Sequence, residues 1–138
     1  MRRVLPALIA VVAVVAVVAV LAACNSSTGP DADVTGTWSG TWVTTIPAGP
    51  TEPWSGTLAQ SGTAVTGSVS CQGIETYTVT GTNVQNTLTL VLVGTLADTA
   101  RFNGAASANN GVSASGTFND NDGAGCFSGY GSWTGKVQ

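Results

Sequence analysis

The stretch that decides the fold runs from residue 34 to residue 44 and reads Val34-Thr35-Gly36-Thr37-Trp38-Ser39-Gly40-Thr41-Trp42-Val43-Thr44. Its residues alternate with a period of two, with apolar residues and glycines on one face and mainly hydroxyl residues on the other. This alternation is typical of a β-strand with one buried face. Because Trp38 and Trp42 both lie on the buried face, the strand needs a large apolar surface opposite it. The stretch therefore predicts an all-β domain organised around this strand.

The rest of the chain repeats the same pattern. The predicted strands span residues 34–45, 54–60, 64–71, 75–81, 87–93, 100–107, 112–118 and 127–136. Short turns at Gly62, at residues 82–86 and at Asn109-Asn110-Gly111 alternate with longer connections, which indicates a meander with one trimmed end and one long-loop end. Eight antiparallel strands with one apolar face close into a barrel, because closure leaves no unpaired edge. We expect an eight-stranded antiparallel up-and-down β-barrel over residues 34–138, with a β-sandwich as the alternative.

The first 23 residues have the features of a signal peptide, which is removed from the mature protein. Arg2 and Arg3 precede an apolar run, expected to be a signal helix, that ends at Cys24. The tetrapeptide Leu21-Ala22-Ala23-Cys24 resembles the lipobox of bacterial lipoproteins, and the resemblance implies cleavage before Cys24 and attachment of lipid to it. The alternative is an uncleaved membrane anchor, since about 20 apolar residues span a bilayer. Residues 24–33 are expected to form a flexible tether.

The mature chain is acidic and contains no histidine. After the signal segment it keeps two basic residues, Arg101 and Lys136, against seven acids, which gives a formal charge of −5. Nucleic acid is therefore not an expected partner. Without histidine, and with no hydroxyl that has a visible activating partner, the chain is not expected to be an enzyme. The segment from Phe118 to Gly123 is similar to part of a calcium loop but lacks two acidic ligands of an EF-hand, so neither a metal nor a cofactor is expected.

The three cysteines divide into one plus two. With Cys24 lipidated, Cys71 and Cys126 remain in an oxidising compartment, where we expect a disulfide between them. In the predicted barrel both lie at the long-loop end, but four strands apart. Because the Cα atoms of a disulfide lie about 5.5 Å apart, either the loop from Asn119 to Cys126 folds across the mouth or the barrel is flattened. The disulfide therefore predicts a narrowed mouth.

The triplet Gly36-Thr37-Trp38 at the start of the first strand resembles the Gly-X-Trp signature of the calycins, the group of lipocalins and avidins. The resemblance implies a barrel that holds a small apolar ligand, with the connection from Pro47 to Pro53 in the place of a lid. Lipocalins usually place an arginine of the last strand against the signature tryptophan, whereas here we expect Trp133 opposite Trp38. Aromatic residues either line such a pocket or fill the core. The candidate ligand-binding residues are Trp42, Trp54, Tyr77 and Phe127.

Carboxylates at the long-loop end suggest a second function. They form a candidate rim for a basic partner, although acids also simply keep loops soluble, and they are Glu52, Glu75, Asp98, Asp120 and Asp122. Two functions remain: a non-catalytic, lipid-anchored envelope module with an apolar ligand in its barrel, or an interaction protein or inhibitor that docks on a basic protein. Either would lie on the periplasmic or surface face of a bacterial membrane. An internal void of about 300 Å³ or more favours the first function, and a filled barrel favours the second.

Overall fold

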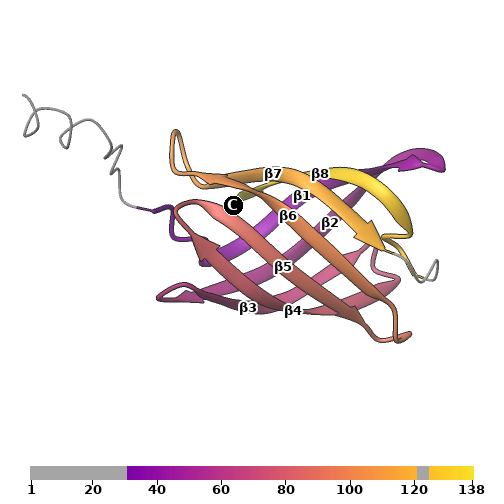
Figure 1. The fold of residues 1–138 in the computed structure, drawn as a ribbon, viewed down its shortest axis with the longest axis horizontal. Coiled ribbons are helices and arrows are strands. Elements are labelled where there is room, and N and C mark those ends of the chain that lie inside the picture. The colour runs from indigo at the N-terminus through magenta and orange to yellow at the C-terminus, as the bar shows by residue number, and fades with distance from the viewer. Residues whose placement is uncertain (1–30, 121–124) are drawn as a thin grey trace, which may run out of the picture. The chain divides into compact units, whose positions relative to one another are not determined.

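The alternating pattern folds into eight antiparallel strands that close on themselves (Figure 1). The computed structural model describes residues 31–120 and 125–138, so the predicted signal segment, Cys24 and Asp122 lie outside the described residues. The strands are β1 (Gly36–Ile46), β2 (Ala48–Ser61), β3 (Ala64–Cys71), β4 (Glu75–Val84), β5 (Thr87–Gly94), β6 (Thr99–Ser107), β7 (Ser113–Asp120) and β8 (Gly129–Val137). Each strand pairs with the next, and β8 pairs with β1. The predicted up-and-down barrel is confirmed, and the sandwich is excluded.

Successive connections alternate between the two ends of the barrel, as an up-and-down meander requires (Figure 1). Within the described ranges, no helix is long and apolar enough to cross a membrane.

The largest departure from the predicted strands is at β2, which begins at Ala48 and not at residue 54. Residues 51–53 pair with residues 41–43 of β1, so the expected lid is the tip of a long hairpin that turns at Pro47 (Figure 1). The prolines of this segment suggested a loop. They are tolerated because pairing between β2 and β3 stops at Trp54, so beyond that point β2 is an edge strand in which a missing N–H costs little.

The seam between β1 and β8 has a different register from the expected one. Trp133 lies opposite Trp42, and Val137 lies opposite Trp38. The alternation of the sequence fixes which face is buried, but it does not distinguish registers that differ by an even number of residues. The ring of Trp38 stacks instead on Trp54, with 6.5 Å between the ring centroids.

Residues ahead of β1 close the trimmed end of the barrel. Ala32 and Val34 are buried. The Ala32 N–H donates to the Asn86 side chain at 2.6 Å, and the Asn83 amide donates to the Ala32 carbonyl at 2.8 Å. The indole N–H of Trp38 donates to the Val34 carbonyl at 2.8 Å. The sequence predicts Ala32 as part of the flexible tether, but in the structure it belongs to the barrel core.

Candidate functional site

The four candidate ligand-binding aromatics pack against one another or against other core side chains. Trp42, Tyr77 and Phe127 meet at the long-loop end, where the Phe127 ring lies 5.1 Å from the rings of both Trp42 and Tyr77. Trp54 belongs to a second cluster, with Trp133 edge-on to it at 6.3 Å. Phe127 precedes β8 and is fully buried, so it fills the mouth of the barrel.

The interior between these clusters is filled. An internal void of about 20 Å³ remains, lined by inward side chains that include Leu88, Leu90 and Phe102. A space of this size holds roughly one water molecule. Sites for drug-sized ligands begin at about 300 Å³, so the described interior has no room for such a ligand.

The mouth at the long-loop end is covered by the segment that carries Cys126. The predicted disulfide joins Cys71 and Cys126, whose Cα atoms lie 6.3 Å apart. The Cys126 N–H donates to the hydroxyl of Tyr77, an inward residue of β4, at 3.0 Å. Gly125 has a φ of +82°, and a side chain there would collide with Tyr77 and Asp98. The chain therefore crosses the mouth, which is the first of the two geometries that the disulfide predicted.

The expected acidic rim is largely buried, which corrects the expectation of an exposed collar. Glu75, Asp98 and Asp120 are each almost fully buried. Glu75 and Asp120 lie two residues from Tyr77 and Phe118 on the same strands, so the period of two turns them inward. Glu52 is partly exposed on the hairpin, and Asp122 lies outside the described residues.

Two of the buried carboxyls form a cluster around Tyr77. The Tyr77 hydroxyl oxygen lies 2.8 Å from Glu75 Oε2 and 2.6 Å from Asp98 Oδ2. A phenol carries one proton, so it satisfies one of these short contacts and a carboxyl proton is needed for the other. Glu75 also accepts the Leu96 N–H at 3.1 Å.

The environment decides which carboxyl of this cluster keeps the proton. Burial raises the pKa of Asp98, and neighbouring Glu75 raises it further, against the lowering effect of the Tyr77 hydrogen bond. Burial also raises the pKa of Glu75, but hydrogen bonds from Tyr77 and from the Leu96 N–H outweigh this effect and lower it. The opposite directions of the two pKa shifts favour Asp98 as the carboxyl that holds the proton and Glu75 as the one that is charged. Burial and the two carboxyls raise the pKa of Tyr77, so the phenol stays neutral.

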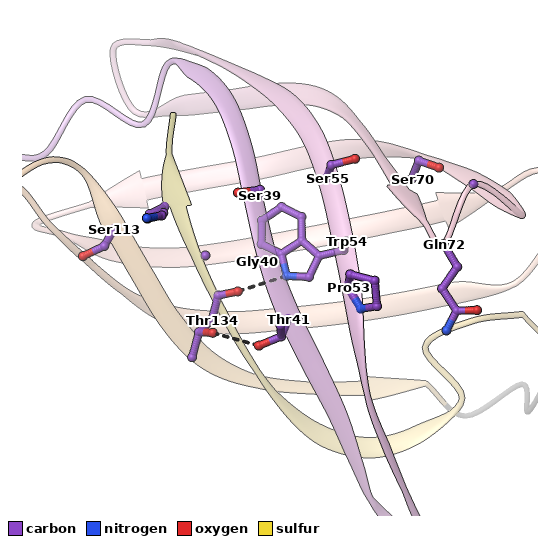
Figure 2. A pocket seen from close by; sticks show the side chains of 13 residues that line it. Ser39, Gly40, Thr41, Pro53, Trp54, Ser55, Ser70, Gln72, Ser113 and Thr134 are labelled. Carbon is purple, nitrogen blue, oxygen red and sulfur yellow. Dashed lines mark hydrogen bonds between the residues drawn. The ribbon is translucent and has the colours of Figure 1, made fainter.

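A large hollow lies on the outside of the barrel, over β8, β1, β2 and β3, and has a volume of about 920 Å³ (Figure 2). Its lining is mostly small and hydroxylated, with Lys136 at one side and Gln72 at the other. Figure 2 shows Ser39, Ser55 and Ser70 on three neighbouring strands. We call this hollow the outer groove.

The sequence analysis missed the outer groove, because its residues come together only through pairing across strands. The available signal was the serine at positions 39, 55 and 70, where other outward positions of the same strands often hold threonine.

Comparison with known proteins finds no match to this chain among family models, curated proteins or solved structures. The closed eight-stranded meander is consistent with a calycin-like fold. Fold and site together define a small β-barrel with a filled interior and an open groove on its outer surface.

Proposed function

We propose that this chain is a non-catalytic binding module of the cell envelope, anchored by lipid on Cys24, that binds its ligand on the outer surface of the barrel. The observation that carries the proposal is the contrast between an interior void of about 20 Å³ and an outer groove of about 920 Å³. Sites for small ligands usually measure about 300 to 1,000 Å³. The groove falls in this range and the interior does not.

The calycin-like alternative places an apolar ligand inside the barrel. Such a ligand would have to displace the packed aromatic side chains at the mouth, among them Phe127, whose ring contacts the rings of Trp42, Tyr77, Phe102 and Phe118. Tight cores resist such displacement, since even small changes of volume destabilise them. The filled interior therefore favours binding from outside.

Docking of a basic protein on an acidic rim has less support. Three of the five candidate carboxyls are buried, and two of these share a proton with Tyr77. A buried carboxyl that already has hydrogen-bond partners offers little to a partner at the surface.

Lipid attachment is supported by the lipobox-like tetrapeptide that ends at Cys24. Two acyl chains are enough for stable attachment to a membrane. The first strand of the barrel, β1, begins at Gly36, so the proposed lipid site and the barrel are neighbours in sequence.

The proposal is tested by photo-cross-linking in cells that export the chain. A photoreactive residue replaces Ser55 in the groove or, as a matched control, Thr89, which is exposed on β5 outside the groove. We expect adducts from position 55 and few from position 89. Native mass spectrometry of the delipidated protein is the complement: a co-purified apolar molecule without adducts at position 55 would place the ligand inside the barrel and contradict the proposal.

A further inference from the structure

We infer that the outer groove is a glycan-binding site that takes an extended, polyhydroxylated chain, neutral or with a single acidic group beside Lys136. The inference rests on the proposed function and names the ligand class for the same surface.

A row of small hydroxyl side chains runs along the groove, across the strands. Ser113 pairs with Lys136, Lys136 with Ser39, Ser39 with Ser55, and Ser55 with Ser70. Paired residues share a face, so these side chains all point outward in one line. Neighbouring strands lie about 4.8 Å apart, so five strands give a line about 19 Å long. Ser39 Oγ already accepts a hydrogen bond from Gln138 Nε2, so the groove presents the hydroxyls of Ser55, Ser70 and Ser113 to a ligand several units long.

Serine leaves more room in this row than threonine does. The adjacent outward row has Thr37 paired with Thr57, whose additional methyl groups make their side chains broader than serine. Pro53 and Gln72 also line the hollow. Among the described residues the hydroxyls of Ser55 and Ser70 form no hydrogen bond with another residue, so they are available as donors and acceptors.

The floor of the groove is fixed by a buried indole. Gly40 and Gly135 face each other across the seam, and a side chain at either position would collide with Trp54 beneath them. The Trp54 N–H donates to the Thr134 carbonyl at 3.0 Å (Figure 2). The floor is thus preformed, which lowers the entropic cost of binding.

A peptide does not fit this surface as well as a glycan does. Extended peptides commonly bind by adding a strand to a sheet edge, but Ser39 and Ser55 are paired on both sides, as barrel closure requires. Recognition must therefore come from side-chain hydroxyls, which suits a ligand that carries hydroxyls along its length.

Charge restricts the ligand further. Among the described residues, no carboxylate lines the groove and Lys136 is its one charged side chain. A cationic ligand finds no counter-charge there, and one lysine is too little for a nucleic acid, whose binding depends on neutralising many phosphates. A glycan that is neutral or carries one acidic group meets both conditions.

The test is calorimetric titration of the delipidated domain with cellotetraose, tetra-N-acetylchitotetraose and a cellotetraose in which one residue is oxidised to glucuronate, which represent neutral, amide-bearing and singly acidic glycans. We expect at least one of them to bind. The double variant Ser55→Val and Ser70→Val, which removes two hydroxyls, should weaken that binding at least tenfold. The matched control is Thr80→Val and Thr89→Val, at exposed positions of β4 and β5 outside the groove, and it should bind as the wild type does.

Because valine favours strands, we expect all variants to fold, and circular dichroism checks this. If the double variant does not fold, two single variants replace it in the titration. They are Lys136→Gln, and Ser55→Thr, which narrows the groove and keeps a hydroxyl. Absence of binding by all three tetrasaccharides, or equal binding by groove and control variants, overturns the glycan assignment. If position 55 nevertheless forms cross-links to a protein or lipid, the proposed function stands without the glycan assignment. If it forms no cross-links either, both the proposed function and the glycan assignment are wrong.

Discussion

At the scale of single residues, Trp38 connects parts of the chain that are far apart in sequence. It is almost fully buried and its ring stacks on Trp54 of β2. Its indole N–H donates to the Val34 carbonyl ahead of β1. Its opposite neighbour across the seam is Val137, near the C-terminus. One indole thus contacts the seam between β1 and β8, the neighbouring strand β2, and the residues ahead of β1 that close the trimmed end.

We predict that Trp38→Ala destabilises the domain by about 3 to 5 kcal/mol, because a large buried side chain is replaced by a cavity. Urea unfolding followed by fluorescence measures the loss. Thr37→Ala, at the exposed neighbouring position, is the control and should change stability by less than about 0.5 kcal/mol. A loss below about 1 kcal/mol for Trp38→Ala would contradict the packing described.

The raised pKa of Asp98 leads to a prediction about how the stability of the domain depends on pH. Because the pKa of Asp98 is raised in the folded state, that state binds more protons than the unfolded chain, and stability falls as pH rises from about 4, the ordinary aspartate pKa, through the raised value. The pKa of Glu75 is lowered, so its contribution is present above the ordinary glutamate pKa and is lost as pH falls through the lowered value.

We therefore predict that Asp98→Asn, which keeps a donor in place of the carboxyl proton, flattens the loss of stability above about pH 4. The measurement is the free energy of unfolding of wild type and variant across the acid and neutral range. Glu52→Gln, outside the cluster, is the control and should keep the wild-type slope. Parallel curves for wild type and Asp98→Asn would show that the proton does not reside on Asp98.

At the scale of elements, the segment that covers the mouth has its own test. We predict that a Cys71→Ser, Cys126→Ser double variant that remains folded takes up more of an apolar fluorescent probe than wild type does, because Phe127 is no longer held in the mouth by the disulfide. The variant should also lose stability, by roughly 4 kcal/mol for a loop of this size. Equal probe uptake, or free thiols at both positions in exported protein, would show that the disulfide does not close the mouth.

The strands were predictable because a period of two is a local signal. It placed β3 at Ala64–Cys71 without error and most other boundaries within a few residues. The local signal failed where contacts between distant residues determine the structure. The strand β2 extends through Pro53 because it has a free edge there. The register of Trp133 depends on closure of the seam between β1 and β8. The pattern predicts Glu75 and Asp98 as rim residues at the long-loop end, but both are buried. Their burial depends on a hydrogen-bonded cluster with Tyr77, which no local pattern shows.

At the scale of the whole molecule, the proposed attachment to the membrane depends on Cys24, which lies outside the described residues. We predict that Cys24→Ser releases the protein from the membrane fraction, because the lipid supplies most of the attachment energy. Fractionation of cells that export each form is the measurement. A variant that stays in the membrane would favour the uncleaved apolar anchor over the lipoprotein.

The seam between β1 and β8 also determines when folding can finish. The residues that pair across it are about as far apart in sequence as the domain allows, and such distant pairing slows folding. Until β8 pairs with it, β1 keeps one edge open to any other strand. The Ser and Thr residues on the outward face of β1 keep one face of the unpaired strand polar. Folding of the barrel is therefore complete only when β8 has paired with β1, however early the other strands form.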